Sequence, residues 1–171
     1  MNLKPEPGEY AEYYHRYIKL VPEDSILTFL KDQLNAFQNL FQSINEDKSR
    51  YRYAPEKWSI KEVAGHIIDS ERVFGYRALR FSRNDQNKLP GFEQNDYITN
   101  GNYSNILIEK LTNEFTLLRQ SNLLMFEGFA DNMWLRKGIA SNNIVSVRAL
   151  AYIIGGHTEH HINVLKEKYG C

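Results

Sequence analysis

The stretch SVRALAYIIGGHTEHHINVLKEKY, residues 146–169, decides the fold of this chain. Its apolar side chains recur at steps of three and four from Leu150 to Leu165, which is the period of an amphipathic helix. Two lysines near its end and Gly170 just after it suit a helix C-terminus. The stretch therefore predicts a long helix with one buried face.

Two histidines lie on that apolar face. His157 and His161 are four residues apart, a spacing that stacks two helical side chains on one face with Cβ atoms about 5–6 Å apart. An uncompensated imidazole is costly in an apolar stripe, and one metal ion satisfies two rings together. A hydrogen-bonded or surface pair is the alternative. We interpret the neighbouring His160 as lying behind the ligands or at a surface.

Working outward, two earlier segments show the same helical period. Apolar side chains repeat between residues 30 and 44, and Asp24 or Ser25 supplies the start of this first helix. The second helix opens with Ser59 and Glu62, which form an S-x-x-E capping box. Both segments therefore carry their own start signals.

The remaining segments complete a bundle. We expect the second helix to end near residues 82–84 and a third helix to run from about 104 to 129. Residues 130–143 are interpreted as a connection, and no convincing alternating strand pattern is present. Four amphipathic helices joined by loops predict an all-α four-helix bundle. Residues 1–22, which contain four tyrosines, are expected to form an aromatic arm laid across it.

Length and composition agree with one globular unit. The chain has 171 residues, of which 42% are hydrophobic and 25% are charged, so we expect one domain over 1–171, with the bundle at 23–169. Lys+Arg and Asp+Glu both number 21, which argues against a general nucleic-acid binder. The polar N-terminus lacks the apolar core of a secretory signal, and no run is long enough to span a bilayer. We therefore expect a cytoplasmic protein without a membrane partner.

A third histidine strengthens the metal hypothesis. His66 lies on the inward face of the second predicted helix, beside Val63 and Ser70. Bundles build cofactor sites from facing helices, and three neutral imidazoles leave one coordination position open to water or substrate. The sequence thus predicts one divalent ion on His66, His157 and His161. Imidazole ligands suit zinc, nickel, iron and copper alike.

Two further polar residues of the second helix are candidates for a role in chemistry. Asp69 lies one turn after His66 and could act as a general base or orient an imidazole. A solvated or helix-pairing acid is the alternative. Arg77 falls close to the same face and could hold an anionic group of a thiol cofactor or of the substrate. The alternative for Arg77 is a charge-paired surface residue.

Four segments of the chain together resemble the DinB/YfiT-like superfamily. They are YYHRYI (13–18), YAPEKWSIKEVAGHIIDSER (53–72), LPGFEQNDY (89–97) and the stretch at 146–169. The W-S-x-x-E-x-x-x-H segment paired with a late H-x-x-H-H is the specific part. The resemblance implies a four-helix bundle in which three histidines bind a divalent metal, often nickel or zinc. These ligands fall on His66, His157 and His161.

The resemblance also implies a class of activity. The superfamily is described both as metal-dependent hydrolases and as thiol S-transferases, including bacillithiol transferases and mycothiol-dependent enzymes. We therefore expect an enzyme whose ion activates a low-molecular-weight thiol for transfer or water for hydrolysis, acting on a small molecule. The competing hypothesis is a non-catalytic module in which His160 closes the site as a fourth ligand. A homodimer is expected as well.

Overall fold

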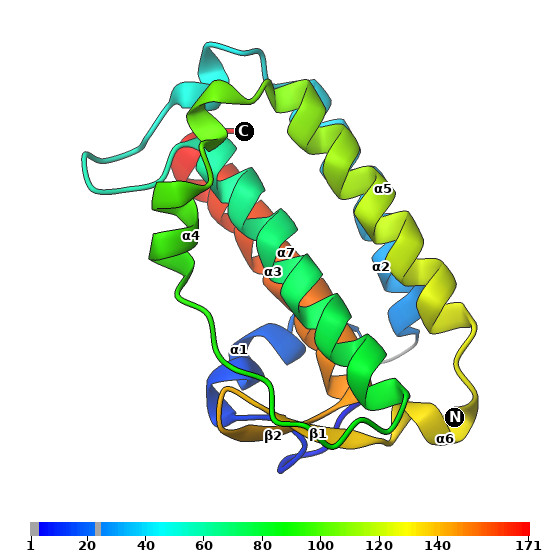
Figure 1. Cartoon of the computed structure of the whole chain (residues 1–171). Helices are drawn as coiled ribbons and strands as arrows, with labels where there is room; N and C mark the ends of the chain where they lie inside the picture. The colour runs from blue at the N-terminus through cyan, green and yellow to red at the C-terminus, as the bar shows by residue number, and fades with distance from the viewer. Residues whose placement is uncertain (1–3, 23–24) are drawn as a thin grey trace.

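The computed structural model describes residues 4–22 and 25–171. Four long helices dominate it, and the expected four-helix bundle is confirmed: α2 (Ile26–Gln42), α3 (Ile60–Ser82), α5 (Ile108–Glu127) and α7 (Val147–Tyr169). Helix α3 packs on α7 and α5, and α2 packs on the same two helices, so that the four close into a ring (Figure 1). Among the described residues, no helix is both long and apolar enough to cross a membrane.

Local capping signals set where these helices begin. The Ser59 backbone N–H donates to the Glu62 carboxylate at 2.6 Å, while the Ser59 hydroxyl accepts from the Glu62 backbone N–H, so the capping box forms as expected. The Ser146 hydroxyl caps α7 by accepting from the Ala149 backbone N–H. Ser25 caps α2, whereas the other candidate, Asp24, lies outside the described residues.

The N-terminal arm packs against the last helix. It contains the 3₁₀ turn η1 (Glu12–Tyr14) and the short helix α1 (His15–Ile18). Helix α1 approaches α7 at Gly156, where an added Cβ would collide with the backbone of Tyr17. The buried Glu9 carboxylate accepts hydrogen bonds from Ser146 and Arg148. The arm is therefore held to α7 by close packing and by an ion pair.

The sequence predicts that residues 130–143 are a connection without strands, and this prediction is wrong in one respect: the segment contributes to a β-hairpin. Strand β1 (Lys137–Ala140) pairs antiparallel with β2 (Asn143–Ser146), with Lys137 opposite Ser146. The turn residues Ser141 and Asn142 have φ values of 50° and 64°, the left-handed conformation that two-residue hairpin loops require. The hairpin lies across the end of α3, as Figure 1 shows.

The third long helix begins later than expected. The 3₁₀ turn η3 (Tyr103–Asn105) precedes it, and the extended residues Ile106 and Leu107 separate that turn from α5 at Ile108. The polar residues at 104 and 105 therefore belong to a turn of their own. The other short elements are η2 (Lys48–Arg50), α4 (Gln94–Asn100) and α6 (Asp131–Trp134).

A layer of buried polar residues divides the core. One apolar cluster occupies the bundle end that holds the start of α7, and a second occupies the end that holds its C-terminus. Between them each long helix contributes buried polar side chains, which we call the polar band: Gln33, His66, Ser70, Glu71, Arg119, Asn122, His157 and Thr158. Burying polar groups costs free energy unless they find partners, so this band is where function is expected.

Candidate metal centre

The three histidines predicted as ligands meet at the interface of α3 and α7. Nε2 of His66 lies 2.9 Å from Nε2 of His157, and the ring of His161 lies 4.8 Å and 4.6 Å from those two rings, centroid to centroid. One ligand nitrogen from each residue lies within 4.8 Å of the others. His66 and His157 are only 3% and 6% exposed. The chain thus brings together three nitrogens that could hold a metal ion.

The three histidines meet because each lies on the face of its helix, α3 or α7, that packs against the other helix. His66 follows the Ser59 cap by two turns, and the indole of Trp58 packs 4.8 Å from its imidazole ring. On α7 the four-residue spacing stacks His157 over His161, while the ring of Tyr17 in the arm contacts His157 edge-on at 5.3 Å. An aromatic ring therefore packs against His66 on α3, and another packs against His157 on α7.

Burial keeps these imidazoles neutral. It lowers the pKa of His66 to about 4, with the nearby His160 adding to the effect. Burial also lowers the pKa of His157 and of His161 well below the ordinary value, and the facing histidines lower it further. Metal ligation requires a neutral imidazole with a free lone pair. The three rings are therefore in the ligand-competent state at neutral pH.

A metal ion fits this donor set. Two Nε2 atoms that face each other can share one proton at most, so in the metal-free protein one of the two acts as the acceptor. Within the described chain, His161 makes ring contacts and no hydrogen bond. An ion accepts all three lone pairs at once, which no arrangement of protons does. Three histidines and an open position are the donor set of a catalytic zinc site.

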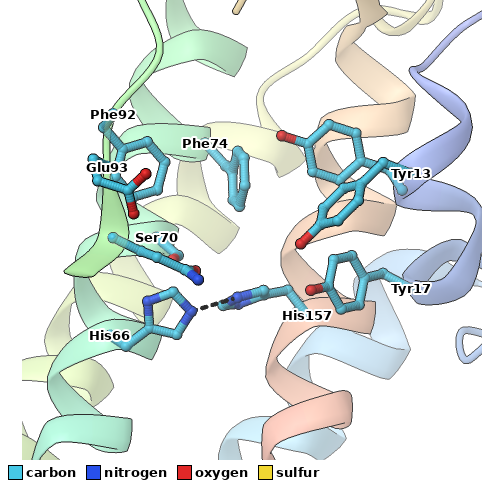
Figure 2. A pocket seen from close by; sticks show the side chains of 10 residues that line it. Tyr13, Tyr17, His66, Ser70, Phe74, Phe92, Glu93 and His157 are labelled. Atoms are coloured by element: carbon cyan, nitrogen blue, oxygen red, sulfur yellow. Dashed lines mark hydrogen bonds between the residues drawn. The ribbon is translucent and has the colours of Figure 1, made fainter.

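The centre opens into a cavity of about 220 Å³. Figure 2 shows His66 and His157 pointing toward one another at its floor, with Tyr13 and Tyr17 along one wall and Phe92 and Glu93 along the other. Its lining residues come from the arm, α3, the segment before α4, and α7: Tyr13, Tyr14, Tyr17, His66, Ser70, Phe74, Phe92, Glu93, Gln94 and His157. A small molecule can therefore reach two of the three histidines.

One hydroxyl in this cavity lacks a partner. Ser70 is 1% exposed, and its Oγ makes no hydrogen bond within the described chain. It lies one turn beyond His66 on α3 and lines the cavity. Buried polar groups are nearly always hydrogen-bonded. The Ser70 hydroxyl is thus available to a bound molecule.

The other side of the polar band is satisfied internally. Arg119, which is 0% exposed, donates from Nε and Nη2 to the two oxygens of Glu71 at 2.7 and 2.8 Å. The same guanidinium also donates to Gln33 and Thr158. Glu71 therefore serves the ion pair and is turned away from the histidines.

The two other predicted site residues lie outside the cavity lining. Asp69 accepts a hydrogen bond from the hydroxyl of Tyr103, and burial raises the pKa of its carboxyl group. Its catalytic role stays a prediction. Arg77 is 3% exposed and has no ion-pair partner in the described chain, so the alternative of a charge-paired surface arginine is wrong. His160 is not one of the three clustered ligands; its ring packs edge-on against Tyr17 and lies 5.0 Å from the ring of His161.

Sequence reasoning missed the cavity walls. Glu93 caps α4 by accepting from the Asn95 backbone N–H at 3.1 Å, and it is the one acid among the described residues that line the cavity. Tyr13 and Tyr17 both accept from the Arg16 guanidinium. The acidic N-cap and the aromatic arm were visible in the sequence, but only the tertiary fold brings them to the histidines.

Two solved structures have a similar fold. YfiT from Bacillus subtilis, described as a probable metal-dependent hydrolase with an unusual four-helix bundle topology, is 14% identical at a TM-score of 0.71, covering 98% of this chain and 93% of YfiT. A mycothiol-dependent maleylpyruvate isomerase is 9% identical at a TM-score of 0.70, covering 85% of this chain but only 61% of that protein. No curated protein matches the sequence.

A family model supplies the assignment. The model of the DinB superfamily matches residues 30–165, a span that begins in α2 and contains His66, His157 and His161. This match covers most of the chain and includes every ligand candidate. The chain therefore belongs to the DinB superfamily.

Proposed function

We propose that this protein is a metal-dependent enzyme that binds one divalent ion, zinc or nickel, on His66, His157 and His161. The observation that carries the proposal is the set of three neutral imidazoles, two buried and one partly buried, whose ligand nitrogens lie within 4.8 Å of one another. Beside them lies a cavity able to admit a small molecule.

The reaction is the activation of a small nucleophile. When bound, the ion would act as a Lewis acid and lower the pKa of a thiol or a water molecule. The chain supplies the rest: Ser70 offers a hydrogen bond inside the cavity, and the phenol rings of the arm restrict access from solvent. In an S-transferase the nucleophile is a low-molecular-weight thiol, and in a hydrolase it is water. Of the two similar structures, one is a probable metal-dependent hydrolase and the other is an isomerase that depends on the thiol mycothiol.

We assign proton transfer to Glu93 in preference to Asp69. Glu93 lines the cavity, and its hydrogen bond to Asn95 involves one carboxylate oxygen, which leaves the other for a nucleophile. Asp69 is engaged by Tyr103 outside the lining. A general base contributes about 10²–10⁴-fold to a rate. Glu93→Gln should therefore lower kcat by about that factor, and by more than Asp69→Asn does.

A purely structural ion is the competing function. It requires a fourth protein ligand, for which His160 is the neighbouring candidate. His160 is not one of the three clustered residues, and its ring packs against Tyr17. This placement favours an open coordination position and hence the enzyme.

The first test is the metal content of protein purified without an affinity tag. We expect about one equivalent in the wild type and almost none in His157→Ala/His161→Ala. His160→Ala is the matched control, since it removes an imidazole from the same helix and should keep the ion. Loss of the ion in His160→Ala would favour the structural module instead. Wild-type protein that is empty and cannot be reloaded would refute the metal proposal altogether.

The second test separates the two activities. The metal-loaded protein is given an activated ester, and in parallel an electrophile with each of several small thiols. A transferase consumes thiol and electrophile in equal amounts, whereas a hydrolase releases acid without thiol. Activity that survives in His157→Ala/His161→Ala would not come from this centre.

A further inference from the structure

A second hollow lies beside the metal cavity. Its volume is about 310 Å³, and it is bounded by one side of α3 and by the segment that leads to α4. Phe92 lines both this hollow and the histidine cavity. Its walls are largely apolar, formed by side chains such as Val73, Leu89 and Tyr97. It is therefore an adjoining space for a further part of a ligand.

A buried arginine lines this hollow and has no counter-ion in the described chain. Arg77 is 3% exposed, and its Nη2 donates to the Pro90 carbonyl at 2.8 Å and to the Ser141 hydroxyl at 3.0 Å. The Tyr14 hydroxyl is its third partner. All three partners are neutral, and within the described chain no carboxylate pairs with this guanidinium. Burial accordingly lowers the pKa of Arg77.

The contrast with Arg119 shows what is missing. Both arginines are buried, but Arg119 binds the two oxygens of Glu71. A buried charge without an opposite charge is strongly unfavourable, and a guanidinium is shaped to bind a carboxylate through two parallel hydrogen bonds. Arg119 therefore has its anion, Glu71, within the chain, whereas Arg77 has no such anion in the described residues.

The rest of the hollow points to the kind of anion. Arg72, which pairs with Glu114 at 2.7 Å, adds a second guanidinium at the rim. No acid lines the hollow in the described part of the chain, and the rings of Tyr76, Phe92 and Tyr97 surround it. Apolar and aromatic walls suit an organic body and disfavour a fully hydrated inorganic ion.

We propose that this hollow binds the carboxylate end of an elongated organic substrate, with Arg77 as the residue that selects for the negative charge. Arg77 lies eleven residues after His66 on α3, which is about 16 Å of helix rise. A ligand that spans both sites must therefore be extended and pass Phe92. The link to catalysis rests on the proposed metal-dependent function, but the anion site itself does not.

The test uses benzoate and its neutral analogue benzamide as probes, followed by NMR titration of ¹⁵N-labelled protein. The wild type should bind benzoate at least about tenfold more tightly than benzamide, since charge-assisted hydrogen bonds are worth about 1.5–3 kcal/mol. The backbone amides of Gly91 and Tyr97, which line the hollow, should shift. Arg77→Met should abolish the preference for benzoate, and Arg77→Lys should keep part of it.

Arg83→Met is the matched control, because Arg83 is exposed on the turn after α3 and does not line the hollow. It should bind benzoate as the wild type does. The amide spectrum of each variant reports whether it is folded, and Arg77→Lys carries the test if Arg77→Met is not. Equal affinity for the two probes, or equal benzoate affinity in Arg77→Met and Arg83→Met, would overturn the proposal.

Repeating the titration after treatment with a chelator separates this site from the metal centre. Benzoate binding should persist in the metal-free protein, because Arg77 and not the ion holds the carboxylate. Binding that disappears with the metal would overturn the anion site while supporting the metal centre. Wild-type protein that is purified without metal, cannot be loaded with metal and still selects benzoate would refute the proposed enzyme and leave the anion site standing.

Discussion

Buried polar groups are paired with one another on one side of the polar band and are left only partly paired on the other side. On one side, Arg119 and Glu71 pair through two hydrogen bonds, and Gln33 and Thr158 bind the remaining donors of the guanidinium. On the other side, the ring nitrogens of His66, His157 and His161 meet, and the described chain offers no set of hydrogen-bond donors for all three lone pairs. Ser70 beside them has no partner.

This difference teaches where to look for function in a bundle core. Buried polar groups that satisfy one another serve the fold, whereas buried groups that remain unsatisfied indicate a missing ligand. Both sides use the same helices, since Ser70 and Glu71 are neighbours on α3, as are His157 and Thr158 on α7. Adjacent residues on one helix thus belong to a structural network and to a binding site.

Loss of the ion pair between Arg119 and Glu71 should have the largest effect on the free energy of unfolding. Arg119→Met leaves the buried carboxylate of Glu71 without its counter-charge, and removal of one partner from a buried pair costs about 3–5 kcal/mol. Urea unfolding at neutral pH measures this loss. Arg119→Met/Glu71→Leu should recover a large share of it. A loss below about 1 kcal/mol in Arg119→Met would contradict the structural role of the pair.

Breaking the histidine side should cost stability only when metal is present. His157→Leu/His161→Leu exchanges two imidazoles, which share one hydrogen bond to His66, for apolar side chains, so the metal-free variant should be as stable as the metal-free wild type or more so. Free metal at 1,000 times its Kd should stabilise the wild type by about 4 kcal/mol and leave the variant unchanged. Thermal unfolding with and without chelator measures both. A variant that metal stabilises equally would place the ion elsewhere.

The pH dependence of the metal-free protein should sharpen the comparison. Burial lowers the pKa of His66 from 6.5 to about 4, so the unfolded chain binds the proton more readily than the folded one. Stability is therefore complete above pH 6.5 and falls as the pH drops toward 4, by about 3 kcal/mol from this residue. Denaturant midpoints between pH 7.5 and 4.5 measure the slope. His66→Leu should reduce the slope and leave the share of His157 and His161, and an unchanged slope in that variant would assign the effect to other groups.

The smallest effect distinguishes two hydroxyls on opposite sides of the band. Ser70→Ala removes a buried hydroxyl that has no partner, so stability should stay constant or rise slightly while affinity for small substrates falls. Thr158→Val removes a hydroxyl that accepts from Arg119 at 3.2 Å and should cost about 1 kcal/mol. Calorimetric unfolding compares the two variants. Equal losses of stability would mean that Ser70 is bonded within the protein.

Local signals in the sequence carried most of the fold. The capping residues Ser59 and Ser146 begin their helices as expected, because capping depends on residues within one turn. The clustering of His66, His157 and His161 was predictable for a similar reason, since each shares a face with apolar neighbours. The hairpin was missed because strands of four residues are too short to show an alternating period.

What the sequence could not show depends on contacts between distant segments. Arg119 and Glu71 are 48 residues apart, and a buried arginine has the same local pattern as an exposed one. Arg77 illustrates the same difficulty, because its burial comes from Pro90 and from Ser141 in the hairpin turn. Glu93 reaches the cavity only because the segment before α4 folds back along α3. These positions follow from the packing of loops, which local periodicity does not encode.

The distance along the chain between His66 and His157 has a consequence for folding kinetics. Their nitrogens meet across 91 residues, so the centre exists only after the last helix has docked on α3. We expect this contact to form after the folding transition state, because closing so long a loop costs entropy before the contact stabilises the chain, and stabilisation that is absent from that state acts on the unfolding rate. An ion held there would therefore slow unfolding and leave the folding rate unchanged. The ion would stabilise the bundle after it has assembled and would play no part in its nucleation.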